Sequence, residues 1–250
     1  MTTVPPLPPC CHPQDDRWPL PRPLPGLHLV SLAFEATELK PEDFRRSQVS
    51  PPASVARAVA KRQAEYLAGR LCAREALRRA AGQPLTPGQN DDGSPLWPTG
   101  TMGSITHTHG WAAAVVGQQH EYAGVGLDAE QIMPDERGHS LSRQILTAPE
   151  QERFRQELTV QAGEFVTLVF SLKETLFKAL YPLVHRRFYF EHAELVSWQP
   201  GGNARLRLLT QLSPDWPIGT ELDAQFARDG QRLISLIAVG PTSHSIQSEG

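Results

Sequence analysis

The sequence has few cysteines, no long hydrophobic run and no excess of charge of one sign. Lys and Arg number 24 and Asp and Glu number 27, so the formal net charge is only -3. A protein that binds nucleic acid through its overall charge would be strongly basic, so we expect no nucleic-acid partner. No apolar run approaches the ~18 residues of a membrane-spanning helix. The N-terminal stretch also lacks the basic start and apolar core of a secretory signal, so no membrane partner is expected.

Cysteine occurs only at positions 10, 11 and 72. Three thiols cannot all pair within one chain, and a bridge between the adjacent Cys10 and Cys11 would be strained. We therefore predict reduced thiols and a cytoplasmic location. Lysine is scarce as well, because only four of the 24 basic residues are lysines and the rest are arginines. Two of these lysines, Lys173 and Lys178, fall within six residues of each other.

The composition otherwise belongs to a protein with a core, at 40% hydrophobic and 20% charged residues. Proline is frequent, and nine of the 23 prolines lie in the first 25 residues, which predicts an irregular N-terminal segment. Trp18, Leu20, Leu24 and Leu27 indicate that this segment is partly laid over the core. We expect no internal repeat, because none is visible in the sequence.

Apolar patterning predicts a mixture of helices and strands. In the first half we expect a strand over 27–34, a helix over 54–81 that begins at Ser54 and ends at Gly82, and a loop over 84–103. Gly69 inside that helix predicts a break or a close packing contact. The apolar runs WAAAVVG and YAGVGLDA, separated by QQHE, predict an antiparallel hairpin.

The second half begins with a capping box at 147–150, which predicts a helix start. The apolar stretch EFVTLVFSLKETLFKALY predicts a further helix that ends at Pro182, and the remainder predicts a meander of strands. Helices and strands do not alternate as they do in a parallel sheet, so the fold class expected is α+β.

The segment GVGLDAE carries the first candidate site. On a strand, Gly126, Asp128 and Glu130 share one face, and the two carboxylates lie roughly 6–7 Å apart along the backbone. Two such charges raise each other's pKa unless a cation sits between them, and Mg²⁺ prefers oxygen ligands. The alternative is a strand end whose polar residues face water.

The segment FSLKETLFKAL carries the second. Its apolar positions form one stripe of a helix, comprising Phe165, Val169, Leu172, Leu176 and Ala179. Thr167, Ser171, Glu174 and Lys178 form a polar stripe on roughly the opposite side. Lys178 could hold a phosphate, or it could form an ordinary exposed pair with Glu174, worth ~0.3 kcal/mol.

The segment GSITHTHG offers donors for phosphate oxygens, while a zinc site of His107 and His109 lacks acidic or cysteine ligands nearby. If the predicted hairpin turns near residue 119, Glu130 lies opposite His109 and Asp128 lies opposite Trp111. A carboxylate pair and a donor-rich segment would then be neighbours, as a phosphate chain with a divalent cation requires.

The helix expected over 54–81 carries seven basic residues against Glu65 and Glu75. Arg70, Arg74 and Arg78 recur every fourth residue and share a face. This face is either solvated or a binding surface for an anionic ligand or partner.

Taken together, these segments resemble a known family. AKRQAEYLAGRLCAREAL, GSPLWP followed by GSITHT, GVGLDAE and FSLKETLFKAL occur in this order in 4′-phosphopantetheinyl transferases, with the closest likeness to the enterobactin synthase component D type. The resemblance covers roughly residues 55 to 190, and GVGLDAE followed by FSLKETLFKA is its most specific part.

The resemblance implies two similar α/β halves with the active site between them. We expect a proline-rich segment over 1–26, an N-terminal half over 27–120 and a C-terminal half over 121–250. The enzyme would bind coenzyme A and Mg²⁺, move the phosphopantetheine arm to a serine of an apo acyl or peptidyl carrier protein, and release 3′,5′-ADP. Apo acyl carrier and peptidyl carrier proteins are the expected partners of a monomeric enzyme. The sequence leaves open whether these carriers serve fatty-acid, polyketide or peptide synthesis, including that of siderophores.

The resemblance also implies roles for individual residues. The metal ligands would be Asp128, Glu130 and Glu174; Glu174 would also be the catalytic base, and Lys178 would act in catalysis on the pyrophosphate. The coenzyme A contacts would come from Arg62, Arg70, Arg74, Thr106, His107, Lys173 and Lys178. Glu150 matches a recurrent family glutamate, although its capping-box position explains it equally well.

The sequence departs from the family at Asn90–Ser94, where relatives often carry basic residues before the proline, so a phosphate contact from this loop is in doubt. Two other functions stay open from the sequence. One is a Mg²⁺-dependent nucleotide phosphodiesterase, and the other is a non-catalytic module that binds coenzyme A or a carrier.

Overall fold

The structure is a computed structural model that describes residues 5–241 of the chain. The N-terminal elements are β1 (His28–Ala33), η1 (Ala36–Glu38), α1 (Pro41–Arg46), α2 (Ala53–Ala56), α3 (Ala60–Ala81), β2 (Gly88–Gln89), β3 (Pro95–Leu96), β4 (Thr101–Thr108) and β5 (Trp111–Gln118). The C-terminal elements are β6 (Gly124–Gln131), α4 (Asp135–Ile145), α5 (Ala148–Arg153), α6 (Arg155–Val160), α7 (Ala162–Val184), η2 (Phe190–His192), β7 (Ala193–Gln199), β8 (Asn203–Leu208), β9 (Glu221–Asp229) and β10 (Arg232–Val239).

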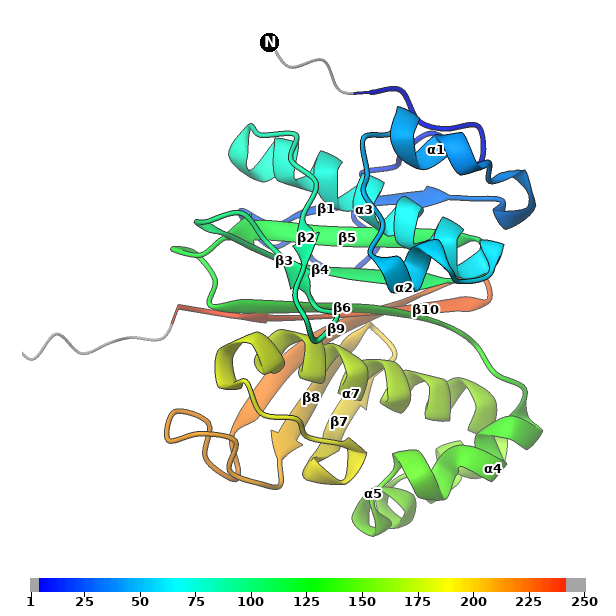
Figure 1. Cartoon of the computed structure of the whole chain (residues 1–250). Coiled ribbons are helices and arrows are strands. Elements are labelled where there is room, and N and C mark those ends of the chain that lie inside the picture. The colour runs from blue at the N-terminus through cyan, green and yellow to red at the C-terminus, as the bar shows by residue number, and fades with distance from the viewer. Residues whose placement is uncertain (1–4, 242–250) are drawn as a thin grey trace, which may run out of the picture.

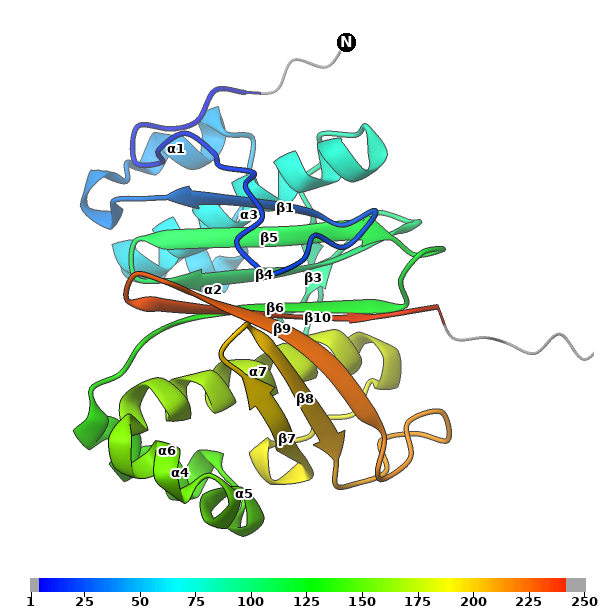
Figure 2. The same cartoon turned by 180° about the vertical axis from the view of Figure 1, so that it is seen from behind.

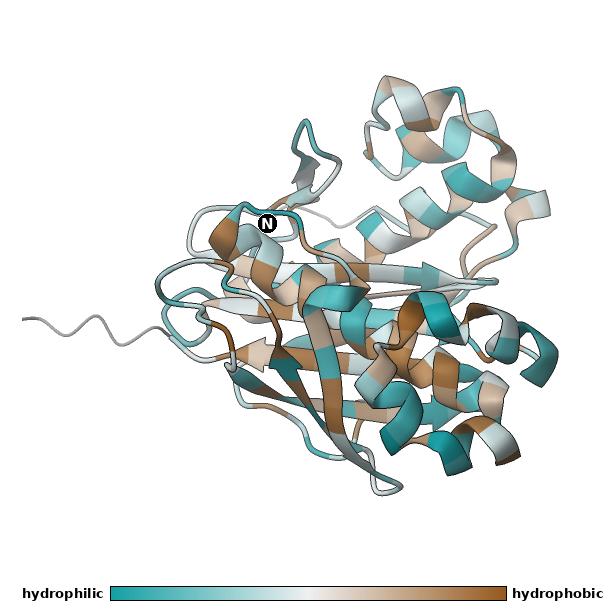
Figure 3. Ribbon diagram, turned by 90° about the horizontal axis from the view of Figure 1, so that it is seen from below, coloured by the Kyte–Doolittle hydropathy of each residue, from teal (hydrophilic) through white to brown (hydrophobic). Residues whose placement is uncertain are grey.

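These elements form two sheet-and-helix halves, which confirms the mixed α+β class. The first sheet has the order β1-β5-β4 and the second β6-β10-β9-β8-β7, and their paired strands are antiparallel. Helix α3 packs on the first sheet and α7 on the second, both on the side nearer the viewer in Figure 1. In Figure 3 the helices of the second half alternate between apolar and polar positions, as expected for elements with one face on the core.

The two sheets meet along a seam between β4 and β6. Here side chains take the place of a backbone ladder: Ser104 Oγ accepts a hydrogen bond from the amide of Leu127 at 3.0 Å, and Thr106 Oγ1 accepts one from the amide of Ala129 at 3.0 Å. These hydroxyls satisfy buried backbone donors that an edge strand would otherwise leave unpaired. The seam therefore holds the halves together while leaving space on the helix side for a site.

The proline-rich segment crosses the back of this seam (Figure 2). Asp15 exchanges backbone hydrogen bonds with Ser31 of β1, and farther along Gln225 Oε1 of β9 accepts from the amide of Arg22 at 2.8 Å. Leu20 is buried in an apolar cluster built from both sheets. The prediction that this segment covers the core is thus correct for its described residues.

The predicted hairpin of the two apolar runs is wrong. Strand β5 pairs with β1 and β4, whereas β6 pairs with β10, so Asp128 lies opposite Ser235 and Glu130 opposite Leu233. Of the predicted partners, His109 lies in the turn between β4 and β5, and Trp111 is the first residue of β5. The small side chains of β5 are fully buried beneath α3, and a central strand of this kind needs a partner on each side.

Two helix boundaries also differ from the sequence prediction. The chain breaks after Ala56, and Ser54 lies inside the short α2 rather than at a cap. Helix α7 continues past Pro182 and ends at His185, whose φ of 48° is left-handed. Because Pro182 is only two residues from the helix end, it removes a single terminal hydrogen bond.

Other local expectations are confirmed. Gly82 ends α3 with φ 69°, and Thr147 and Glu150 form the predicted capping box. Gly69 allows a close packing contact, since a Cβ there would lie 2.8 Å from Ile105 Cγ2. The three cysteines are free and buried. Among the residues that the structure describes, no helix combines the length and apolarity needed to cross a bilayer.

Candidate active site

Helix α7 lies unusually close to β6, and this approach builds the site. A Cβ at Gly126 would lie 1.9 Å from the carbonyl oxygen of Thr175, so only glycine fits there. The face of β6 that carries Gly126 also carries Asp128 and Glu130. The close contact therefore brings Glu174 and Lys178 of α7 to the two carboxylates of the strand.

Asp128 is the most tightly held of these residues, at 3% exposed. Its Oδ1 lies 2.6 Å from Nζ of Lys178, and its Oδ2 accepts a hydrogen bond from Ser171 Oγ at 2.8 Å. Ser171 is hydrogen-bonded in turn to Ser235. The carboxylate is thus fixed in one orientation, with an ammonium group on its open side.

The polar stripe predicted on α7 exists but is not solvated. Thr167 and Ser171 are fully buried, and only Glu174 and Lys178 reach the open part of the site. The simple surface pair of Glu174 with Lys178 is not what the structure shows, because Lys178 bonds Asp128 instead. The apolar stripe is buried as predicted.

Glu130 and Glu174 are half-buried carboxylates with perturbed acidity. Burial raises the pKa of Glu130 to about 7, with a further upward contribution from the charge of Asp128. Burial also raises the pKa of Glu174, while the nearby Lys178 opposes that shift. Such crowding of like charges favours a bound cation.

The side chains of Asp128, Glu130 and Glu174 fit a hard divalent cation, because all three offer carboxylate oxygens. In the described part of the chain, however, no three acidic, His or Cys side chains are arranged as a finished metal cluster. Lys178 holds an oxygen of Asp128 in this structure. The residues fit the ion chemically, and the ammonium of Lys178 partly neutralises them.

Donors from the N-terminal half face these carboxylates across the seam. Thr106 Oγ1 donates to Asp128 Oδ1 at 3.5 Å, and Arg62 Nη1 donates to Nε2 of His107 at 2.8 Å. Glu65 Oε2 lies 3.7 Å from Nδ1 of the same imidazole. The donor-rich segment is therefore a neighbour of the acidic strand as predicted, although through the β4–β6 seam rather than through a hairpin.

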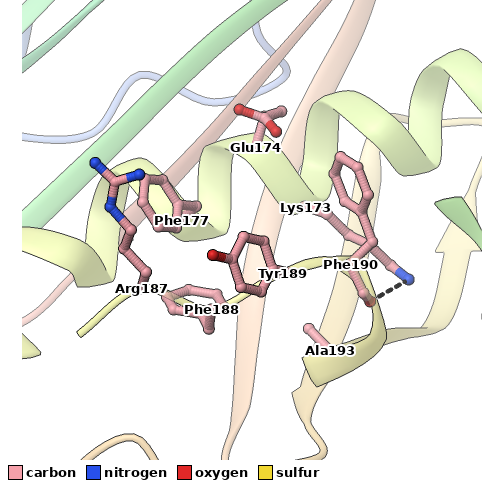
Figure 4. A pocket seen from close by; sticks show the side chains of 8 residues that line it. All are labelled: Lys173, Glu174, Phe177, Arg187, Phe188, Tyr189, Phe190 and Ala193. Atoms are coloured by element: carbon pink, nitrogen blue, oxygen red, sulfur yellow. Dashed lines mark hydrogen bonds between the residues drawn. The ribbon is translucent and has the colours of Figure 1, made fainter. Parts of the chain in front are cut away.

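Of the residues predicted to contact coenzyme A, three bond groups of the protein itself: Lys173, Arg70 and Arg74. Lys173 is 3% exposed, and its ammonium bonds Glu150 Oε2 at 2.7 Å and the carbonyls of Ile145 and Phe190. Figure 4 shows this amine turned away from Glu174. The assignment of Lys173 to the pyrophosphate is therefore not supported by its position. The buried amine of Lys173 instead forms an ion pair with the carboxylate of Glu150.

The three arginines on the basic face of α3 bond groups of the protein itself. Arg74 is buried and donates to the carbonyls of Ser47 and Gln48 and to Thr86 Oγ1. Its guanidinium anchors loops, so its assignment to coenzyme A also lacks support. Arg70 donates to the carbonyl of Gly88 at 3.1 Å and lines a small pocket that Arg62 and His107 share. Arg78 is paired with Glu75.

Two cavities open beside the carboxylates. A slot of about 200 Å³ has one wall formed by Glu174 and Phe177 and another by Phe188, Tyr189 and Phe190 (Figure 4). A larger cavity of about 600 Å³ lies between the halves, bounded by the β2–β3 turn, β4, the start of β6 and the end of α7. Phe177 and Arg187 line both cavities. The sequence reasoning did not find the slot, because its aromatic residues follow the helix in an irregular segment.

Comparison with known proteins agrees with this geometry. The family model of the 4′-phosphopantetheinyl transferase N-terminal domain matches residues 50–117, and that of the 4′-phosphopantetheinyl transferase superfamily matches residues 124–233. The chain is 32% identical over 180 residues to 4′-phosphopantetheinyl transferase Npt of Nocardia iowensis, which covers 70% of this chain and 78% of that protein.

Two further relatives match over shorter lengths. Identity is 37% over 161 residues to 4′-phosphopantetheinyl transferase Svp of Streptomyces mobaraensis, 63% of each chain. It is 39% over 119 residues to enterobactin synthase component D of Salmonella typhimurium, 48% of each chain. The alignments to these two relatives thus span less than two thirds of their length. With two consecutive family matches and a site at the junction of the matched regions, the chain belongs to the 4′-phosphopantetheinyl transferase family, enzymes that transfer the phosphopantetheine of coenzyme A to carrier proteins.

Proposed function

We propose that the transfer takes place at the seam between β4 and β6. In this proposal the ligands of Mg²⁺ are Asp128, Glu130 and Glu174. The residues that hold the pyrophosphate of coenzyme A are Lys178 and His107. The observation that carries this proposal is the 2.6 Å contact of Lys178 Nζ with Asp128 Oδ1, beside two carboxylates of raised pKa. A cluster of carboxylates and one ammonium group at a junction of two cavities suits a phosphate chain and its metal ion.

The two cavities suit the two ends of coenzyme A. The slot is lined by aromatic rings and ends at Glu174, so it accommodates the slender pantetheine arm. The larger cavity offers the indole of Trp97 and the ring of Tyr181 together with polar groups of the β2–β3 turn, which suits the nucleotide. The pyrophosphate then lies between the cavities, next to Lys178.

The reaction needs a base, a fixed phosphate and charge neutralisation. The serine oxygen of the carrier attacks the phosphorus attached to pantetheine, its proton passes to a Glu174 carboxylate oxygen, and the bond to the oxygen of 3′,5′-ADP breaks. Burial raises the pKa of Glu174, which makes its carboxylate a better proton acceptor. Lys178 offsets the negative charge that develops on the leaving group. Burial lowers the pKa of His107, so this residue helps to orient the phosphates as a neutral imidazole. Mg²⁺, when bound, would supply further charge neutralisation.

Intact-mass analysis of apo carrier proteins tests this function. Acyl and peptidyl carriers of fatty-acid, siderophore and nonribosomal-peptide type are incubated with the enzyme and coenzyme A, with Mg²⁺ or with a chelator. We expect a mass gain of one phosphopantetheine on the carrier serine and equal release of 3′,5′-ADP, both dependent on Mg²⁺. Release of 3′,5′-ADP without a carrier would indicate a phosphodiesterase, and binding without either product would indicate a non-catalytic module.

We further propose that the enzyme acts as a monomer in the cytoplasm, with 27–120 and 121–250 as its two halves and 1–26 as a proline-rich N-terminal segment. The site is complete within one chain, since β4, β6 and α7 supply its polar groups. Sedimentation at working concentration tests the oligomeric state. A carrier-modifying activity that sedimented only as a dimer would contradict the monomer.

A further inference from the structure

The tip of the β2–β3 hairpin, which belongs to the N-terminal half, contacts α7 of the C-terminal half. Asp92 Oδ2 accepts a hydrogen bond from the hydroxyl of Tyr181 at 2.8 Å, although the two residues are 89 positions apart. Both residues line the cavity of about 600 Å³ between the halves. In Figure 1 the hairpin reaches down from the upper half toward α7. This contact therefore closes one side of the cavity.

Asp92 is held in place by its own turn. Its Oδ1 accepts hydrogen bonds from the amide of Ser94 at 2.9 Å and from Ser94 Oγ at 2.6 Å. These bonds lower the pKa of Asp92 to about 2, and the hydroxyl of Tyr181 and the charge of Arg187 contribute in the same direction. The carboxylate is thus ionised at neutral pH and directs Oδ2 toward Tyr181.

Tyr181 is also oriented by a neighbouring side chain of α7. Its ring stacks on Phe177, with centroids 5.1 Å apart and an angle of 24° between the planes. Phe177 lines both the larger cavity and the slot beside Glu174. The Tyr181 hydroxyl is therefore placed by a residue that itself belongs to the site.

The hairpin forms a two-stranded sheet of its own, and its ladder is short. Strands β2 and β3 share only the pairs Gly88–Leu96 and Gln89–Pro95. Arg70 of α3 holds the carbonyl of Gly88 at 3.1 Å. Trp97, directly after β3, packs against the core of the N-terminal half, whereas the tip of the hairpin contacts α7 through Asp92.

Asp92 and its neighbour Asp91 are anionic groups beside a cavity that we assign to a nucleotide with phosphates. As phosphate ligands they would be repulsive. A role of Asp92 in closing the cavity explains why its carboxylate bonds Tyr181 of the other half and lies beside the positive charge of Arg187.

We propose that Asp92 and Tyr181, with Arg187 beside them, form a latch that closes the hairpin over the nucleotide end of coenzyme A and slows its release. This inference rests on the proposed function, because it takes coenzyme A as the ligand of the cavity. The latch opens when the single hydrogen bond at the tip breaks, which admits or releases the nucleotide. It is a positioning device, and neither residue takes part in the chemical step.

Coenzyme A binding to the full chain tests the latch through a double-mutant cycle. Stopped-flow and calorimetric titrations are made with wild type, Tyr181→Phe, Asp92→Ala and the double variant. An exposed hydrogen bond to a charged group is worth a modest amount, so each single variant should raise the dissociation rate and Kd roughly threefold to tenfold. The double variant should bind coenzyme A no more weakly than the worse single variant.

Asp91→Ala is the matched control, because it removes the same charge from the same turn at an exposed residue that does not line the cavity. If charge alone matters, Asp91→Ala and Asp92→Ala both tighten coenzyme A binding. The latch predicts that only Asp92→Ala weakens it.

Additive effects in the cycle, or tighter binding by Asp92→Ala, would overturn the latch while leaving the proposed function intact. Failure of the wild type to bind coenzyme A would overturn the proposed function itself and the latch with it. A melting temperature measured for each variant shows that the comparison is made on folded protein.

Discussion

The ammonium of Lys178 lies 2.6 Å from Oδ1 of Asp128, across the contact between helix α7 and strand β6. This pair joins the two most specific segments of the sequence, GVGLDAE and FSLKETLFKA. The two residues are 50 positions apart along the chain. Ser171 holds the other oxygen of Asp128, so the pair has a fixed position within the C-terminal half.

Replacing Asp128 should nearly abolish the transfer. Asp128→Asn keeps the size and the hydrogen bond acceptor but removes the charge that the metal ion and Lys178 share. We expect loss of more than the roughly 10–100-fold seen for residues that only support a metal ligand. The measurement is the rate of carrier modification as a function of Mg²⁺ concentration. Asp223→Asn, an exposed carboxylate paired with Arg205, is the control. Retention of more than a tenth of wild-type turnover at limiting Mg²⁺ would remove Asp128 from the metal ligands.

Lys178→Ala should weaken coenzyme A binding and also lower turnover, because the pyrophosphate loses a cation both in the ground state and as charge develops on the leaving group. Lys178→Arg should restore only part of the loss, since a planar guanidinium does not reproduce a compact ammonium. Titration of coenzyme A binding alongside initial rates separates the two effects. Wild-type affinity in Lys178→Ala would mean that the lysine serves Asp128 alone.

The raised pKa of Glu130 predicts a pH dependence of stability in the metal-free protein. The carboxyl titrates near 4.5 in the unfolded chain and at about 7 when folded. Between these two pH values the folded protein keeps a proton on Glu130 that the unfolded chain has lost. The free energy of unfolding should therefore fall as the pH rises from about 4.5 to about 7. Urea denaturation at several pH values, with a chelator present, measures this slope. Glu130→Gln should make this slope shallower, while the raised pKa of Glu174 keeps a contribution of the same sign. An equal slope in that variant would assign the effect to another group.

Lys173 should matter for stability and not for coenzyme A. Its amine and Glu150 form a buried pair, at 2% and 0% side-chain exposure. Lys173→Ala leaves the carboxylate without its charged partner, and breaking a buried pair costs about 3–5 kcal/mol. Chemical denaturation should show this loss, while the Kd for coenzyme A of the folded fraction stays near that of wild type. A normal stability with weakened coenzyme A binding would return Lys173 to the phosphate site.

The sequence predicts the site better than it predicts the strand pairing. The alternation of polar residues on β6 places Asp128 and Glu130 on one face, because side chains alternate on any strand whatever its partner. Strands β5 and β6 are both apolar, and apolarity does not indicate which neighbours a strand has. The pairing depends on burial beneath α3, which local pattern does not encode.

The same distinction applies to the basic helix. The spacing of Arg70 and Arg74 correctly places them on one face, but spacing does not show whether that face meets solvent, substrate or loop carbonyls. Arg74 is buried against the carbonyls of Ser47 and Gln48, which are far away in sequence. Gly126 is the opposite case, because the glycine that admits α7 is visible in GVGLDAE, although its reason appears only in the packing.

Glu174→Gln is the most direct test of the account, since it keeps the size of the side chain and removes its charge and its ability to accept a proton. Single-turnover transfer to an apo carrier is measured together with coenzyme A binding. Glu164→Gln serves as the control, on the same helix but paired with Arg228. We predict that Glu174→Gln loses nearly all transfer while coenzyme A binding weakens far less, and that Glu164→Gln behaves as wild type. Normal transfer by Glu174→Gln would contradict the assignment of the base and of this seam as the catalytic site.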